Sequence, residues 1–181
     1  MASWQQTARR IRVPLSFAFA AVYLWLAQPS WTSIAAGSVV ALPGLWLRAV
    51  ASGHVHKDTE LATTGPYAYT RNPLYAGSLV LAAGFAVAAR SPWVVLLMLL
   101  MFVGVYLPVI RSEEEYLRRT FHEFEEYARR VPRLLPRLRA EAGAQGSFSA
   151  DLYRRHREYN AVLGVAGMMA ALAAKIVWFP R

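Results

Sequence analysis

Five apolar segments set the fold of this chain, because each is close to the length that a helix needs to cross a lipid bilayer. A helix crosses a hydrocarbon core of about 30 Å with roughly 17 to 25 residues. The segments 31–51, 92–110 and 161–179 reach that length, and the segments 13–27 and 74–89 fall slightly short of it. Tilt or local thinning of the bilayer absorbs such a difference. We therefore predict an all-α, polytopic membrane protein with about five transmembrane helices and a cytoplasmic amphipathic helix.

The composition agrees with a membrane protein and removes several functional classes. Of the 181 residues, 56% are hydrophobic and only 17% are charged, which is too apolar for an ordinary soluble domain of this size. The absence of cysteine excludes disulfides, thiolate metal sites and a cysteine nucleophile. The four histidines show no ligand spacing of the His-Glu-x-x-His kind, so we expect no metal site.

The basic residues gather on one side of the predicted bundle. If five helices cross the membrane, 17 of the 20 Lys and Arg residues fall on one side, and only Arg90, Lys175 and Arg181 fall on the other. The positive-inside rule then places the N-terminus and the segments 52–73 and 111–159 in the cytoplasm. The net charge of +9 indicates contact with anionic lipid headgroups rather than with nucleic acid, because it is concentrated beside membrane spans.

We predict a single membrane domain over residues 1–181. Two N-terminal transmembrane helices occupy residues 13–51. A polar loop, a helical hairpin and a cytoplasmic helix occupy 52–137, followed by a linker and surface segment at 138–159. A C-terminal transmembrane helix occupies 160–179. This last helix is rich in small residues, which suit close helix contact, so we expect it to pack within the protein or to form a homodimer.

The stretch GPYAYTRNPLYAGS, residues 65–78, is polar and stiff although it stands at the entrance to a membrane segment. Pro66 and Pro73 fix the backbone on both sides of an arginine and an asparagine. Gly77, inside the following helix, allows a ligand or a neighbouring helix to come close. The stretch therefore predicts a rigid polar turn at the membrane surface.

A second polar stretch, residues 111–131, predicts an amphipathic helix. Its apolar residues recur at helical spacing, and Glu and Arg occupy the remaining faces. Ser112 and Glu115 could form a capping box at its start, or the fourth apolar segment could continue into it without a break. Pro132 and Pro136 end this helix, and the chain after it should fold back as an extended strap against the membrane face.

Together the two stretches resemble the isoprenylcysteine carboxyl methyltransferase and phospholipid methyltransferase superfamily. The resemblance implies an integral-membrane enzyme that transfers a methyl group from S-adenosylmethionine to a lipid-like acceptor. Asn72 stands where the isoprenylcysteine branch usually has His, and the run Asn-Pro-x-Tyr-x-Gly-Ser is closer to the phosphatidylethanolamine branch. The residues that carry the resemblance are Gly65, Pro66, Tyr67, Arg71, Asn72, Pro73, Tyr75, Gly77, Glu113, Glu114, Leu117, Phe121, Tyr127, Val131, Pro132 and Arg133.

The chemistry of S-adenosylmethionine suits several of these residues. Arg71 offers a planar fork to the carboxylate, and Glu113 or Glu114 can hold the α-amino group or ribose hydroxyls and offset the sulfonium charge. We predict these three as catalytic and expect the 65–78 turn and the acidic helix start to meet in space around the cofactor. The predicted cofactor-binding residues are His56, with His54 as the alternative, and Leu61, Gly65, Tyr67, Arg71, Asn72, Pro73, Tyr75, Gly77, Glu113 and Glu114.

The acceptor should enter sideways from the lipid and react by direct displacement at the methyl carbon, which needs close contact and little water. An amine acceptor would give its proton to a glutamate near the pocket or to water. A carboxylate acceptor needs no base but needs a cation. Arg129 and Arg133 are the predicted substrate-binding residues, and Arg48 is a further candidate.

Each residue taken singly has a plainer explanation. Arg71 could bind a headgroup phosphate, Gly77 could be a helix-packing notch, and the glutamates could serve only the helix dipole. Two other functions also fit part of the pattern: a membrane reductase of the sterol type that uses NADPH, and a non-enzymatic membrane scaffold. The joint occurrence of both motifs favours the methyltransferase.

Overall fold

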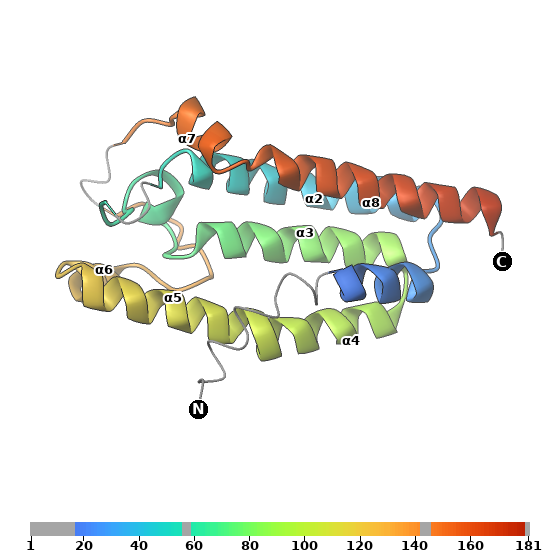
Figure 1. Cartoon of the computed structure of the whole chain (residues 1–181), viewed down its shortest axis with the longest axis horizontal. Coiled ribbons are helices and arrows are strands. Elements are labelled where there is room, and N and C mark those ends of the chain that lie inside the picture. The colour runs from blue at the N-terminus through green and yellow to red at the C-terminus, as the bar shows by residue number, and fades with distance from the viewer. Residues whose placement is uncertain (1–16, 56–58, 142–145, 180–181) are drawn as a thin grey trace.

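The computed structural model describes residues 17–55, 59–141 and 146–179, and this part of the chain is helical and has no β-strand. The long helices run side by side along the long axis of the molecule (Figure 1). The short polar elements gather at the end that carries α6 and α7. The elements are a first helix Phe17–Leu26, then α2 (Trp31–Ser52), η1 (Gly65–Ala68), α3 (Pro73–Ala89), α4 (Pro92–Met101), η2 (Phe102–Tyr106), α5 (Leu107–Thr120), α6 (Phe124–Arg130), α7 (Ala150–Arg155) and α8 (Tyr159–Trp178).

Three of the helices are long and apolar enough to cross a membrane. They are α2 with 22 residues, the continuous helix Pro92–Thr120 with 29, and α8 with 20. Phe17–Leu26 and Pro73–Ala89 are apolar but shorter, and both correspond to the segments that the sequence marked as slightly short. The predicted all-α membrane fold is therefore confirmed.

The fourth apolar segment continues into the amphipathic segment without a break. Ser112 lies inside α5, so the alternative that it caps a new helix is wrong. A π-helical turn, η2, interrupts the regular pattern just before Pro108, a residue that has no N–H to donate to the helix.

The amphipathic segment is two helices rather than the single one predicted over 111–131. Helix α5 ends at Thr120, Phe121 is extended, and α6 begins at Phe124. The break turns the apolar face of α6 inward, where Phe124, Tyr127 and Val131 form a buried cluster. Burying this cluster overrides the helical propensity of the residues at the break.

Helices α2 and α3 pack at very close range through two reciprocal pairs of glycines. A Cβ on Gly37 would lie 2.5 Å from the carbonyl oxygen of Gly84, and a Cβ on Gly44 would lie 2.7 Å from that of Gly77. The reverse distances, from Gly84 and from Gly77, are 2.6 and 2.9 Å. Only residues without a side chain allow two helix backbones to approach so closely.

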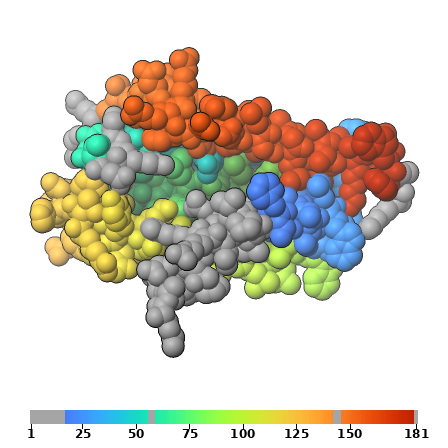
Figure 2. All heavy atoms as spheres, in the orientation of Figure 1, coloured from blue at the N-terminus to red at the C-terminus, as the bar shows by residue number. Residues whose placement is uncertain are grey.

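At the end of the bundle away from α6 and α7, a lysine of α8 joins that helix to the first helix. Lys175 Nζ donates to the carbonyl oxygens of Leu24, Trp25 and Ala27 at 2.5, 3.1 and 2.7 Å. These carbonyls belong to the end of the first helix, where no further turn of helix supplies a donor. Figure 2 shows α8, coloured orange to red, along one edge of the molecule with the first helix in blue beside it.

The two glycines of α8, Gly164 and Gly167, face away from the bundle. A Cβ on either of them would meet no atom of the described residues within 4 Å. The homodimer expected through this helix stays a prediction, and this is the face that it would use.

Candidate functional site

Glu114 is the centre of a polar cluster at the end of the bundle that carries α6. Its residue is only 3% exposed. Asn72 Nδ2 donates to Oε1 at 3.0 Å, Arg71 Nε lies 3.3 Å from the same oxygen, and Arg133 Nε and Nη2 both lie 2.8 Å from Oε2. The proline-bracketed turn and the acidic helix therefore meet, as the sequence led us to expect.

The strap that follows α6 lies along the 65–72 turn and holds it in place. The Arg71 amide donates to the Pro132 carbonyl at 2.9 Å, and Thr70 Oγ1 and Asn72 Nδ2 both donate to the Arg133 carbonyl, at 3.1 and 3.0 Å. Farther along, the amides of residues 137 and 141 donate to the carbonyls of residues 69 and 68. One continuous strap thus holds the turn along its length.

The Arg71 guanidinium is largely engaged by the protein. Besides its contact with Glu114, Nη1 donates to the Ala128 carbonyl at 3.2 Å, and the guanidinium lies 5.9 Å from the centre of the Phe124 ring. Nε is fully buried and has no hydrogen-bond partner of good geometry. Its predicted contact with the carboxylate of a cofactor stays a prediction.

Glu113 points to a different place from Glu114. Tyr75 donates its hydroxyl hydrogen to Glu113 Oε1 at 3.0 Å, and the Tyr75 ring packs edge-on against Tyr106 with centroids 6.3 Å apart. Successive residues on a helix point about 100° apart, so Glu114 turns inward to the arginines while Glu113 turns to Tyr75. The two glutamates that the sequence groups together therefore have separate surroundings.

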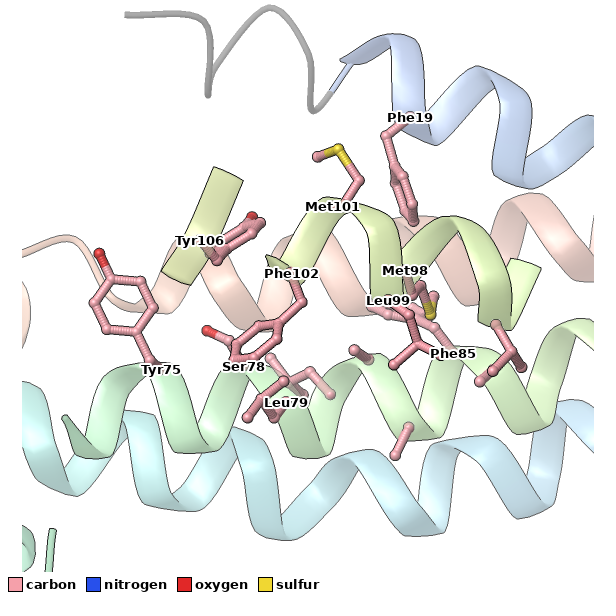
Figure 3. A pocket seen from close by; sticks show the side chains of 15 residues that line it. Phe19, Tyr75, Ser78, Leu79, Phe85, Met98, Leu99, Met101, Phe102 and Tyr106 are labelled. Atoms are coloured by element: carbon pink, nitrogen blue, oxygen red, sulfur yellow. The ribbon is translucent and has the colours of Figure 1, made fainter. Parts of the chain in front are cut away.

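A cavity of about 410 Å³ lies between α3 and the α4–η2 helix, and Tyr75 stands at one end of it. Figure 3 shows Ser78, Leu79 and Phe85 on the α3 side of this cavity. The facing residues are Met98, Leu99, Met101, Phe102 and Tyr106, with Phe19 from the first helix. The hydroxyls of Tyr75, Ser78 and Tyr106 are its polar side-chain groups, so the cavity suits an apolar chain whose polar end lies near Tyr75.

Sequence reasoning expected a pocket open to the lipid but did not place it between these helices or name most of its lining residues. The sequence signal was weak: Ser78 and Tyr106 are polar residues inside otherwise apolar segments. A hydroxyl in such a segment more often bonds to its own helix backbone, as Ser78 does to the Leu74 carbonyl.

Gly65 and His54 pack directly on each other. Gly65 has φ of 56°, a left-handed conformation that favours glycine, and a Cβ there would lie 2.6 Å from the His54 imidazole. His54 Nδ1 also lies 2.9 Å from the Val50 carbonyl oxygen. His56, the preferred histidine of the sequence prediction, lies outside the described residues.

The other predicted residues either pack against neighbouring elements or lie at the surface. Tyr67 is buried, and its backbone carbonyl accepts a hydrogen bond of 2.8 Å from the Tyr127 hydroxyl. Burial raises the pKa of both phenols, so both are neutral at physiological pH. Leu61 packs against the buried cluster of α6. Gly77 faces α2, which favours the packing alternative for this residue, and Arg129 is exposed on α6.

The described residues contain no group of three or more His, Asp or Glu side chains that could hold a metal ion. Residues 50–123 match the phospholipid methyltransferase family, which confirms the resemblance seen in the sequence. Together with the apolar helices, this match identifies an integral membrane protein.

Two relatives are named for metal resistance. The chain is 40% identical over 115 residues to the nickel-cobalt-cadmium resistance protein NccN of Alcaligenes xylosoxydans xylosoxydans, which is 63% of this chain and 53% of that protein. It is 39% identical over 101 residues to the cobalt-zinc-cadmium resistance protein CzcN of Cupriavidus metallidurans, which is 56% of this chain and 46% of that protein. The matches thus span about half the length of each relative. No solved structure matches the chain significantly.

Proposed function

Because residues 50–123 match the phospholipid methyltransferase family, we propose that this protein transfers a methyl group from S-adenosylmethionine to a lipophilic acceptor. The observation that carries the proposal is the position of the apolar cavity, which ends at Tyr75, beside Glu113 and the Glu114 cluster. An apolar chain in the cavity would place its polar end next to these charged groups. The basic residues on the same side as the cluster favour a cytoplasmic orientation of this site.

The residues around the cluster fit the cofactor. Arg71 Nε is buried 3.3 Å from Glu114 Oε1 but makes no hydrogen bond of good geometry to the described residues, and a buried donor of this kind calls for an acceptor. Glu113 is a carboxylate held by one phenol, and it can pair with an ammonium group. When bound, S-adenosylmethionine supplies an electrophilic methyl group on a positively charged sulfur.

This chain would contribute positioning and proton transfer. The cavity walls exclude water and hold the acceptor's apolar part, which restricts the approach of its reactive atom. With an amine acceptor, Glu113 takes the proton that the nitrogen loses, and Tyr75 keeps the carboxylate in place. With a carboxylate acceptor no proton moves, and the neighbouring arginines offset its charge.

The cofactor is tested by following the thermal midpoint of the purified protein in detergent with S-adenosylhomocysteine and with NADPH. We expect a shift with S-adenosylhomocysteine that falls in Arg71→Ala and in Glu113→Gln. Glu115→Gln is the matched control, because Glu115 is a neighbouring residue that pairs with the exposed Arg119. A shift with NADPH alone would instead support the reductase of the sterol type.

The acceptor is tested by incubating the protein with lipid extracts and S-adenosylmethionine labelled in its methyl group. Label should move into the organic phase with the unaltered chain and much less with Glu113→Gln. If S-adenosylhomocysteine binds but no lipid is labelled, the acceptor is not a lipid of that extract. If neither compound binds, the scaffold alternative stands.

The names of the two relatives suggest that the activity contributes to metal resistance. In cells that depend on this chain for growth in cobalt or nickel, the unaltered chain should restore growth and Glu113→Gln should not. Equal restoration by both would separate metal resistance from methyl transfer.

A further inference from the structure

Arg48, near the C-terminal end of α2, joins three helices through its guanidinium. Its Nε donates to Glu158 Oε1 at 2.6 Å, just before α8. Its Nη1 donates to Ser78 Oγ at 2.6 Å and to the Leu74 carbonyl at 3.2 Å, both in α3. Gly77 makes room for the stem of this side chain, because a Cβ there would lie 2.6 Å from Arg48 Cγ.

One nitrogen of this guanidinium has no hydrogen-bond partner in the part of the chain that the structure describes. Both hydrogens of Nη1 and the hydrogen of Nε are used, whereas Nη2 makes no hydrogen bond to any of the described residues. The side chains of Arg48 and Glu158 are only 22% and 11% exposed. Among the described residues, Arg71 Nε is the one side-chain nitrogen that is both fully buried and without a hydrogen-bond partner. Nη2 of Arg48 is therefore not fully buried, and a ligand can reach it.

Arg48 lies close to the proposed reaction site. Ser78, which accepts from its Nη1, also lines the apolar cavity. Burial raises the pKa of Tyr67, the charges of Glu113 and Glu158 raise it further, and the charge of Arg48 lowers it. The charges of Glu113, Glu158 and Arg48 therefore all act on the Tyr67 phenol.

An arginine in a membrane helix is costly, and such residues commonly mark a binding site or pathway. Removing an arginine and a glutamate from water is repaid only when the remaining hydrogen-bond donors are also satisfied. Here α2, α3 and the start of α8 together hold Arg48 in one geometry, with one accessible side left over.

We propose that Arg48 is a further binding residue of this site, and that its Nη2 binds an anionic oxygen of a carboxylate or a phosphate. The identity of that ligand rests on the proposed function: the oxygen belongs either to the amino-acid end of the cofactor or to the head group of the acceptor. Arg48 and Glu158 both lie outside the segment 50–123 that matches the methyltransferase family. Glu158 supplies the counter-charge that keeps Arg48 in place.

Two pairs of probes test this inference on the purified full chain in detergent. S-adenosylhomocysteine is compared with its decarboxylated analogue, and hexadecanoate is compared with hexadecanol. In one of the pairs the unaltered chain should bind the carboxylate at least about tenfold more tightly, because a hydrogen bond to a charged group discriminates by this amount or more. Arg48→Gln should abolish that preference. Arg154→Gln, an exposed arginine of α7, is the matched control and should keep it.

The outcomes separate the two sources. Loss of the preference in the first pair assigns Arg48 to the cofactor, and loss in the second pair assigns it to the acceptor. No preference in the unaltered chain, or the same preference in Arg48→Gln, overturns the inference. If S-adenosylhomocysteine binds neither protein, the proposed function fails while the hexadecanoate pair still decides the role of Arg48. If Arg48→Gln does not fold, Arg48→Lys replaces it and should lose part of the preference, because a lysine lacks the planar fork.

Discussion

Helix α3 has two sides that meet their neighbours in opposite ways. On the α2 side, Gly77 and Gly84 let the two backbones touch, and no space is left for a Cβ on either glycine. On the α4 side, Leu79 and Phe85 face a cavity of about 410 Å³. One apolar helix therefore forms a close backbone contact on one side and borders a cavity on the other, and the size of the residues on each side decides which one forms.

The largest effect on stability should come from the Glu114 cluster, which joins the start of α3 to α5 near one end of the cavity. Glu114→Ala would leave Arg71 buried without its counter-charge, so we expect a loss of about 3 to 5 kcal/mol in the free energy of unfolding. SDS titration in mixed micelles measures this. Glu115→Ala, at an exposed ion pair, should change stability by less than about 1 kcal/mol. Equal losses would show that the Glu114 cluster does not stabilise the packing of α3 against α5.

The next largest effect on stability should come from the glycine contact between α2 and α3. Gly84→Ala would place a Cβ 2.6 Å from the Gly37 carbonyl oxygen and 2.9 Å from the Ala41 Cβ, so we expect a loss of about 1 to 3 kcal/mol from overpacking. Gly164→Ala makes the same change at a position where no atom of the described part of the chain lies within 4 Å of the added Cβ. It should leave stability unchanged or raise it slightly, because alanine favours the helix. The same titration compares the two.

A smaller effect should come from the end of the cavity. Tyr75→Phe removes the hydrogen bond to Glu113, which costs about 1 kcal/mol. If Tyr75 holds Glu113 for the reaction, methyl transfer to the acceptor should fall about fivefold or more. Tyr69→Phe changes an exposed tyrosine and should leave the rate of label transfer as it was. An unchanged rate in Tyr75→Phe would separate Glu113 from the chemistry.

The smallest effect on stability should come from a larger side chain in the cavity between α3 and α4. Ala82 lines the cavity, so Ala82→Leu adds apolar volume where space exists, and we expect a change within about 0.5 kcal/mol. Binding of hexadecanol should nevertheless weaken, because the added side chain takes its place. Ala166→Leu, on the exposed side of α8, should affect neither quantity. A large loss of stability in Ala82→Leu would show that the cavity cannot accept further atoms.

The meeting of the 65–78 turn with Glu114 could be predicted, because a hairpin of two antiparallel helices returns the chain to the side it left. The roles of single cations could not be predicted. Arg71 and Arg133 carry the same charge, and only the path of the strap decides that both contact Glu114. Nothing in the apolar spacing of 111–131 marks the break at Phe121, because burial of α6 decides it.

Arg48 shows the limit of sequence reasoning most clearly. In the sequence it is a basic residue near the end of an apolar segment, and it is one of several cations that could hold a carboxylate. Its partners Ser78 and Glu158 lie 30 and 110 residues farther along. No local pattern connects residues at such separations, so the geometry that singles out its Nη2 had to come from the fold.

The bond between Lys175 and the carbonyl oxygens at the end of the first helix bears on how the chain is assembled. During synthesis the first helix enters the membrane well before α8 leaves the ribosome, so its terminal carbonyls must first be satisfied by water or by other donors. They gain the lysine only when α8 arrives. Docking of α8 therefore completes the first helix as a late step of maturation, and a truncation before residue 175 would leave that helix end open to solvent or to quality control.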